Sequence, residues 1–347
     1  MRQRIKIMRK FLVCMVTLLA MSMASVYADD GRYTRTAMLE QGDSIQLFYG
    51  QDAFQQAYTA AADSGAVITL SKGEFFSSGS DFVINKSIKI IGYYGFSNDP
   101  KQATVFSGTV RPDANNITLD GIYFSRLYIR AVNNLLITHS YISEARAYGY
   151  HYNTILNQCV VRGFDPNFFV NGDGIKITNS TLTNVGNNFI NTEKNANAAH
   201  VLNCVIYTYD QAYLAYAMYE NNIFIGDIGT SSSASRTIYL TYPSIYYYNL
   251  FCSSGDFYID FGWGENDRQR GNGLHKGYKD VLLGQSYPAN TVNPPFPFVG
   301  SDGTPVGPLG GSGFTDHPNI PRVKSQSIGL KPDAEGKINV KITVSAE

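Results

Sequence analysis

The stretch "ITNSTL", residues 177–182, is one of seven six-residue windows in this chain that share one pattern. Every window begins and ends with an apolar residue, and successive windows start 18, 18, 22, 24, 18 and 27 residues apart. A loose repeat of about 20 residues is typical of a solenoid, in which each repeat forms one coil. The windows are "LDGIYF" from Leu119, "ITHSYI" from Ile137, "ILNQCV" from Ile155, "ITNSTL" from Ile177, "VLNCVI" from Val201, "YENNIF" from Tyr219 and "YYYNLF" from Tyr246.

The third position of these windows predicts a sharp bend in each coil. Four consecutive windows carry Asn there, and Asn tolerates the left-handed backbone conformation better than almost any residue except Gly. Each window therefore predicts a short strand, a bend and a second short strand, and stacked Asn side chains can bond amide to amide. The residues at this position are Gly121, His139, Asn157, Asn179, Asn203, Asn221 and Tyr248.

The apolar first and last positions are expected to point inward, because side chains alternate between the two faces of a strand. One coil cannot bury its inner face alone, whereas stacked coils share one continuous core. Helical repeats would need longer amphipathic runs than this chain contains. The sequence therefore predicts an all-β fold, a right-handed parallel β-helix formed by a single solenoid.

Both ends of such a stack need a cover, since open strand edges pair with other chains. "AFQQAYTAAADSG", residues 53–65, has apolar residues at helical spacing and ends in Gly65, which predicts an N-terminal capping helix. "VKSQSIGL" from Val323 and "KINVKITVS" from Lys337 flank "KPDAEG" and predict a C-terminal β-hairpin. We expect a signal peptide at residues 1–28, an N-terminal extension at 29–50, the β-helix at 51–311, and a linker with the hairpin at 312–347.

"VITLSKGEF" from Val67 and "SIKIIGYYG" from Ser87 follow the expected helix. They resemble the first coils of pectate-lyase-like proteins, the superfamily with the pectin lyase fold. "SDGTPVGPLGG" from Ser301 resembles the segment that often closes such helices. The resemblance covers roughly residues 51–311 and implies the parallel β-helix. The superfamily includes lyases, hydrolases, adhesins and uncharacterised exported bacterial proteins, so the fold alone does not choose a function.

Residues 1–28 have the pattern of a secretory signal peptide. Five basic residues precede an apolar run that is short for a membrane span, and cleavage is expected after Ala28. Removing those five basic residues leaves 23 basic and 28 acidic residues, a net charge of −5. Such a chain has no general attraction to nucleic acid or anionic lipid. We expect an exported protein (periplasm, cell surface or extracellular) with no nucleic-acid partner and no membrane span.

"NGDGIKITNSTLTNVGNNFIN", residues 171–191, is similar to a run in the inverting polygalacturonases, which has an Asp in its first motif and an Asp pair in its second. Here Asp173 occupies the first motif, but Asn187 and Asn188 stand at the pair. An inverting hydrolase needs one carboxyl group to protonate the leaving oxygen and another to activate water. Asp173 would be alone, and the competing interpretation is a Gly-rich turn that holds an Asp.

A polysaccharide lyase would need a base, commonly Lys or Arg, near a cation or cationic side chain. In the aligned windows Thr154, Lys176 and His200 form an outward ladder, with Lys194 nearby. Asp173, Lys176, Lys194 and His200 are therefore weak catalytic candidates, and solvated polar residues on an outward face are the competing interpretation. No cofactor is expected. Calcium stays open but unsupported, because it would require clustered carboxylates.

Tyrosines crowd two successive coils, and exposed aromatic faces stack on sugar rings. Tyr219 and Tyr246 fall in the inward column, whereas Tyr247 should point out. The competing interpretation is a ladder of tyrosines that only stabilises the stack. His139 and His151 are expected at turns or on the surface. The predicted ligand-binding residues are Tyr207, Tyr209, Tyr213, Tyr216 and Tyr247.

These patterns favour an exported β-helix protein that binds or helps to process polysaccharide, more as a binder than as a catalyst. Two alternatives stay open. One is a polysaccharide lyase or glycoside hydrolase of the pectate-lyase-like superfamily, and the other is a structural or adhesive surface protein without glycan specificity. An enzyme would show clustered acids or bases in a groove, and a binder would show exposed, coplanar tyrosine rings. The sequence names neither the glycan nor the oligomeric state.

Overall fold

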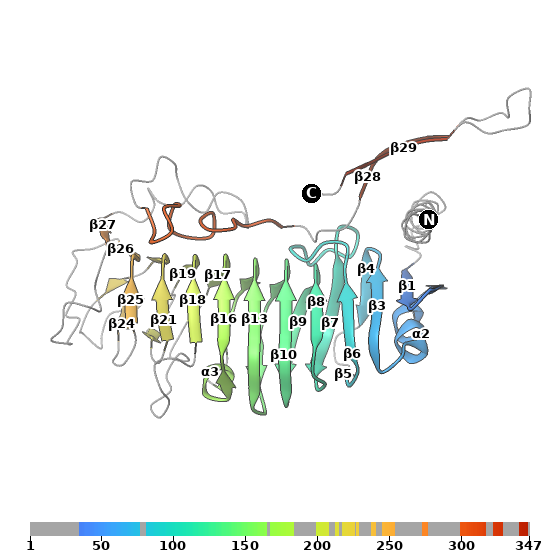
Figure 1. Cartoon of the computed structure of the whole chain (residues 1–347), viewed down its shortest axis with the longest axis horizontal. Helices are drawn as coiled ribbons and strands as arrows, with labels where there is room; N and C mark the ends of the chain where they lie inside the picture. Colours follow the sequence, from blue (N-terminus) through green and yellow to red (C-terminus); the bar gives the residue numbers. More distant parts are fainter. Residues whose placement is uncertain are drawn as a thin grey trace, which may run out of the picture.

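The computed structural model describes residues 35–76, 81–164, 167–183, 199–207, 212–214, 217–225, 227–228, 237–240, 245–253, 273–276, 299–316, 322–328 and 340–345. In this part of the chain the fold is all-β, and parallel strands stack into a β-solenoid as predicted (Figure 1). Consecutive repeats follow one another along the long axis, so each coil packs on the preceding and following coils. The right-handed winding stays a prediction.

Two long sheets form the walls of the solenoid. Sheet A contains β1 (Thr36–Gln41), β2 (Ser44–Tyr49), β3 (Ser64–Leu70), β6 (Ser87–Ile91), β8 (Ile117–Asp120), β10 (Val132–Thr138), β13 (His151–Asn157), β16 (Ile175–Thr178), β18 (Ala199–Leu202), β21 (Ala217–Glu220) and β25 (Ile245–Tyr247). Sheet B contains β4 (Gly73–Phe76), β7 (Thr104–Pro112), β9 (Tyr123–Ile129), β11 (Tyr141–Ile142), β14 (Val160–Val161), β17 (Thr181–Thr183), β19 (Val205–Tyr207), β22 (Ile223–Ile225), β26 (Leu250–Ser253) and β27 (Gly273–Lys276).

Shorter elements lie beside these sheets. β5 (Asp81–Ile84) pairs with β7, β12 (Ala145–Ala147) with β9, and β15 (Gly172–Asp173) with β13. A short helix, α3 (Asn167–Val170), precedes β15 at the corner below β16 in Figure 1. A small parallel sheet consists of β20 (Ala212–Leu214), β24 (Thr237–Leu240) and β23 (Asp227–Ile228).

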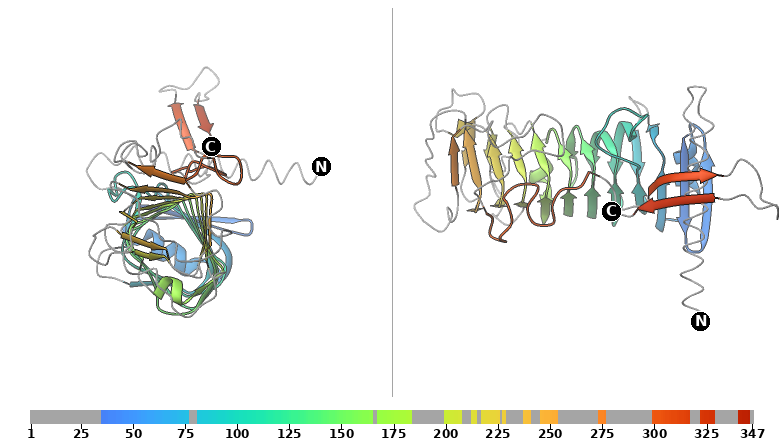
Figure 2. Two further views of the ribbon diagram at one scale, coloured as in Figure 1. Left: turned by 90° about the vertical axis from the view of Figure 1, so that its left-hand side faces the viewer. Right: turned by 90° about the horizontal axis from the view of Figure 1, so that it is seen from above.

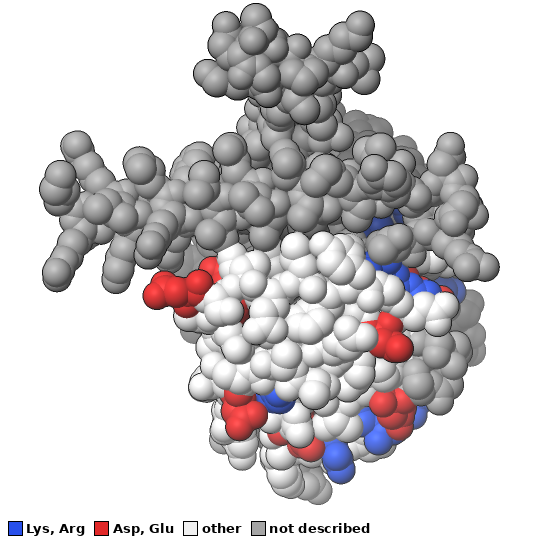
Figure 3. All heavy atoms as spheres, turned by 90° about the vertical axis from the view of Figure 1, so that its right-hand side faces the viewer, with Lys and Arg blue, Asp and Glu red and all other residues white. Residues whose placement is uncertain are grey.

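A hairpin and a helix cover the N-terminal end of the stack. β1 pairs antiparallel with both β2 and β3, which ends the parallel part of sheet A. The helix α2 (Ala53–Ala60) packs Phe54 against Phe82 and Phe106, with ring centroids 4.9 and 5.2 Å away. It ends before Gly65, which lies in β3 with a φ of 76° and does not stop the helix. Figure 3 shows this end of the molecule, where the described charged side chains lie around the rim.

The inward column predicted from the windows is present, with one correction. In the third coil Leu156, not Ile155, pairs with both Ile137 and Ile177. The window there is shifted by one residue, because both residues are apolar and apolarity alone cannot choose between them. The column consists of Leu119, Ile137, Leu156, Ile177, Val201, Tyr219 and Tyr246, and none of these side chains has any solvent exposure.

The same shift moves Thr154 and His151 from the surface to the interior. Thr154 is buried, so its predicted place on the outward ladder is wrong. His151, expected at a turn or on the surface, is also fully buried, with Nδ1 2.8 Å from Thr154 Oγ1 and Nε2 2.8 Å from the Phe168 carbonyl. His139 does lie at a turn but is buried, with Nδ1 2.7 Å from Asp120 Oδ1. Both histidines therefore fill structural positions.

Each of these coils turns at a residue with positive φ at the end of its sheet A strand, as the Asn pattern predicts. In the third coil this residue is Gln158 rather than Asn157, which is the same one-residue shift. The φ values run from 45° at His139 to 68° at Gly121. We call these residues the bend row: Gly121, His139, Gln158, Asn179, Asn203, Asn221 and Tyr248.

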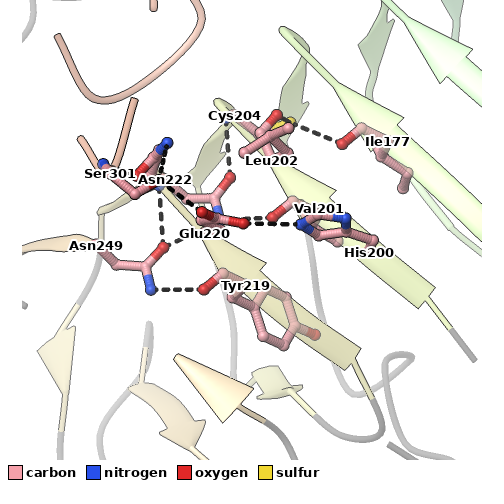
Figure 4. A network of polar contacts seen from close by, with 11 residues as sticks. Ile177, His200, Val201, Leu202, Cys204, Tyr219, Glu220, Asn222, Asn249 and Ser301 are labelled. Carbon is pink, nitrogen blue, oxygen red and sulfur yellow. Dashed lines mark hydrogen bonds and ion pairs between the residues drawn. The ribbon is translucent and has the colours of Figure 1, made fainter. Parts of the chain in front are cut away.

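The position after the bend row carries polar side chains that satisfy the buried backbone at each turn. Ser180 Oγ accepts a hydrogen bond from the Cys159 N–H and donates one to the Thr178 carbonyl. Asn222 Oδ1 accepts one from the Cys204 N–H (Figure 4). Burial raises the pKa of the Cys159 and Cys204 thiols to about 12, so both stay protonated and donate to carbonyls. This interior column consists of Ser140, Cys159, Ser180, Cys204, Asn222 and Asn249.

Residues 299–316, here called the C-terminal strap, run back along the bend row beside several coils (Figures 1 and 2). The segment resembles one that closes β-helices, but it lies along the side of the stack. Its last part contacts a loop near the N-terminal end, where the Phe314 and Phe96 ring centroids are 5.5 Å apart. Its polar contacts pair Ser301 with Asn221, Gly310 with Asn179 and Gly313 with Gln158, at 2.8, 2.6 and 2.8 Å.

The predicted C-terminal hairpin is confirmed. β28 (Arg322–Ile328) pairs antiparallel with β29 (Val340–Ser345), with a register shift between Val323 and Ser325. The first strand starts one residue before the predicted Val323, and the second starts at Val340 rather than Lys337.

We expect Leu156→Ala to lower the free energy of unfolding by about 2–5 kcal/mol, because it opens a cavity in the inward column. Ile155→Ala, the matched control, should cost less than half as much, because Ile155 is only partly buried. Urea denaturation of the protein, followed by circular dichroism, measures both. Equal losses would contradict the one-residue correction to the repeat.

Candidate functional site

Two of the four catalytic candidates, Lys176 and His200, are neighbours on adjacent strands. Lys176 on β16 pairs with His200 on β18, as the outward ladder predicts. Glu220 on β21 lies one coil further on, and its Oε2 is 3.3 Å from His200 Nε2 (Figure 4). Both side chains of this pair are partly exposed, so the cluster lies on the outer surface of sheet A.

Glu220 connects this cluster to the C-terminal strap. Its Oε1 accepts a 2.5 Å hydrogen bond from Ser301 Oγ, so both carboxylate oxygens have neighbours within the protein. A catalytic acid or base must exchange a proton with substrate within hydrogen-bond reach. The contacts of Glu220 are instead those of an anchor that fixes the start of the strap to sheet A.

The pKa of His200 is lowered from its ordinary value near 6.5. Partial burial is the largest cause, the positive charge of Lys176 adds to it, and Glu220 opposes it. His200 is therefore mainly neutral at pH 7, and its contact with Glu220 gains little from charge.

The other catalytic candidates are not brought to this cluster by any described contact. Asp173 is exposed on β15, where it pairs with Tyr152. The next residue, Gly174, has a φ of 64°, so Asp173 begins a Gly-dependent turn. Lys194, and Asn187 with Asn188, lie outside the described residues.

The predicted binding tyrosines are only partly described. Tyr207 on β19 and Tyr247 on β25 are partly buried. Tyr213 lies on β20, whose backbone alone is described, and Tyr209 and Tyr216 lie outside the described residues. The inward placement of two further tyrosines is confirmed, because the rings of Tyr219 and Tyr246 stack 5.0 Å apart inside the core. For those two, the stabilising interpretation is correct.

Three exposed tyrosines that the sequence analysis missed lie at the turn from β12 to β13. Tyr148, Tyr150 and Tyr152 are 60%, 64% and 46% exposed, and we call them the tyrosine corner. Three tyrosines within five residues around Gly149 were a usable signal, because Gly favours a turn and turns lie on the surface. They fall between the windows, where the repeat gives no inward or outward direction.

Neighbouring side chains support the first ring of the tyrosine corner. The rings of Tyr148 and Tyr128 meet edge to face, with centroids 5.4 Å apart. Arg146 lies over the Tyr128 ring at 5.2 Å, and its Nε donates a 2.5 Å hydrogen bond to Glu144 Oε1. Tyr128 donates its hydroxyl to Glu144 Oε2 at 3.1 Å. This network holds Tyr148 against the surface, which lowers the entropic cost of using its ring for binding.

A row of exposed amides accompanies the tyrosine corner along the solenoid. Asn134 Nδ2 donates to Asn116 Oδ1 at 2.9 Å, and Asn153 Nδ2 donates to Asn134 Oδ1 at 3.2 Å. The predicted amide-to-amide bonding thus occurs at the start of the sheet A strands, whereas amides of the bend row bond to the strap. We call Asn116, Asn134 and Asn153 the amide row. Tyr152 is the residue directly before Asn153.

Within the described residues, no group of three His, Cys, Asp or Glu side chains is arranged to hold a metal ion. In the same part of the chain, no helix has the length and apolar character needed to cross a bilayer. Comparison of the chain with protein-family models, curated protein sequences and solved structures finds no match.

We expect the wild type to lose more stability than His200→Gln as the pH falls from about 8 to 5. A histidine whose folded pKa is lowered favours its neutral form, so its contribution is present above the unfolded pKa near 6.5 and is lost below it. Urea midpoints of both proteins across this range measure the difference. Parallel pH curves would contradict the lowered pKa, and a gain for the wild type on acidification would show that Glu220 dominates.

Proposed function

We propose that this protein is an exported β-solenoid that binds polysaccharide through the tyrosine corner. The observation that carries the proposal is the gathering of exposed rings at one place. Among the described residues, six large hydrophobic side chains are exposed, and three of them are Tyr148, Tyr150 and Tyr152. Tyrosine presents a flat apolar face and a polar tip, which suits a sugar ring with its hydroxyls.

The position of the corner favours a polymeric ligand. Tyr148 and Tyr150 lie in the turn after β12, and Tyr152 lies on β13, so the rings follow the curve of one coil. Gly149 allows the close fit of this turn, because a Cβ there would lie 3.2 Å from backbone atoms of Arg130 and Ala131. The turn thus rests on the preceding coil, and its rings face solvent.

Binding is better supported than catalysis. The catalytic candidates with described side chains are dispersed: Lys176 and His200 lie beside a strap anchor, and Asp173 lies beside Tyr152. In the sequence, Asn187 and Asn188 stand where the similar run of the inverting polygalacturonases has its Asp pair, so Asp173 lacks the second carboxyl group that an inverting hydrolase needs. These points support a binder in preference to a lyase or hydrolase of the pectate-lyase-like superfamily.

Export is supported by the sequence of residues 1–28, which has the charge and apolar pattern of a signal peptide. The mature protein would then reach the periplasm, the cell surface or the medium, where polysaccharides occur. Cys159 and Cys204 suit such a compartment, because both thiols are buried and kept protonated.

We expect Tyr148→Ala, Tyr150→Ala and Tyr152→Ala together to weaken polysaccharide retention by at least about tenfold, since each ring loses its stacking contact. Affinity electrophoresis on a panel of plant, algal and host polysaccharides measures retention. Tyr49→Ala is the matched control, because Tyr49 is 51% exposed but lies on β2 at the N-terminal end.

Equal retention by the triple variant and the wild type would move the binding surface elsewhere. Retention of no polysaccharide by the wild type would remove the proposal. Release of new reducing ends from any of these polysaccharides would instead favour the enzyme.

A further inference from the structure

The charged side chains around the tyrosine corner differ in whether they form ion pairs. Arg130 forms an ion pair with Asp113, with 3.3 Å between Nη1 and Oδ2, and Arg146 pairs with Glu144. Asp173 is exposed beside Tyr152 and has no ion pair within the described part of the chain. Among the described residues, the corner therefore presents two ion-paired arginines and one carboxylate without an ion pair.

The nearest cation on the same strands is some distance away. Lys176 on β16 pairs with Ile155, which lies three residues beyond Tyr152 on β13. Tyr152 is thus the direct cross-strand partner of Asp173, whereas the partner of Lys176 lies three residues further along β13.

The amide row supplies uncharged polar groups along the same edge. Each amide offers donors and an acceptor, so it can bond a sugar hydroxyl in either direction. Two hydrogen bonds within the row, 2.9 and 3.2 Å long, use some of these donors and acceptors. The three side chains are exposed, so their other donors and acceptors can bond to a ligand. The row lies along the solenoid, because Asn116, Asn134 and Asn153 belong to consecutive coils.

We infer that the polysaccharide bound at the tyrosine corner is neutral, a polymer of uncharged hexose or pentose units, and that Asp173 excludes acidic glycans. This inference rests on the proposed function and specifies its ligand. Rings stack on Tyr148, Tyr150 and Tyr152, hydroxyls bond to the amide row, and a further hydroxyl donates to the Asp173 carboxylate. A uronate or sulfate group at the same place meets the like charge of Asp173, whereas the described arginines of the corner are already ion-paired.

The test compares two oligosaccharides of equal length and linkage, one neutral and one uronate, by calorimetric titration of the mature protein at low salt. We expect the wild type to bind the neutral oligosaccharide at least about fivefold more tightly, the scale of one unit charge acting across about 4 Å of water. Asp173→Lys changes the charge by two units and should reduce that preference by about 25-fold, mainly through tighter uronate binding. Asp43→Lys, the same charge change in the exposed turn between β1 and β2, should leave the preference unchanged.

Tyr150→Ala should weaken binding of both oligosaccharides, which ties the selectivity to this surface. Equal affinity of the wild type for both compounds, lost in Tyr150→Ala, would overturn the inference and leave the proposed function standing. An unchanged preference in Asp173→Lys would also overturn it. Binding of neither compound, together with no retention on the polysaccharide panel, would overturn the inference and the proposed function together.

Discussion

The left-handed bend that ends each sheet A strand from β8 to β25 is the constraint on which the solenoid depends. It turns the chain from sheet A into sheet B within two residues, and so fixes the register of each coil on the one before. Such a bend needs a residue that tolerates positive φ and a neighbour that satisfies the buried backbone groups. The interior column supplies the neighbour: Ser180 hydroxyl, Cys204 thiol and Asn222 amide perform the same task in successive coils. Where the column carries Asn222 and Asn249, the two amides bond directly, 3.0 Å apart.

The repeat, the parallel stack and the direction of most core side chains could be predicted from the sequence, because two apolar columns flank a recurring bend. The register of the third coil could not be predicted from the sequence. Asn157 suits a left-handed bend better than Gln158 does, and Ile155 is as apolar as Leu156. The structure turns at Gln158, whose amide bonds to the carbonyl of Gly313, 155 residues away. A local propensity was outweighed by a distant partner that no window contains.

The candidate site was less predictable for a related reason. The repeat gives a direction only to residues inside a window or directly before it, so it placed Tyr219, Tyr246, Lys176 and His200 correctly. The tyrosine corner lies between windows, and its exposure depends on how the turn rests on the coil below. The high density of tyrosines led to the prediction of a binding surface on two later coils. Density alone does not distinguish tyrosines stacked in the core from tyrosines exposed to solvent. The contact of Glu220 with Ser301 could not be predicted either, because it joins residues 81 positions apart.

The C-terminal strap limits how the number of coils in this protein can change in evolution. In an ordinary solenoid each coil meets only its neighbours, so a duplicated or deleted coil is easily accommodated. Here a single segment, the strap, forms hydrogen bonds with Asn221, Asn179 and Gln158, which belong to different coils. An additional coil between these residues would shift the coils that follow by about 4.8 Å, one strand spacing. Their bend-row residues would then no longer meet their hydrogen-bond partners on the strap. The strap therefore fixes the number of coils between its contacts. Insertions and deletions are expected instead in the corner loops and in the coils beyond Asn221.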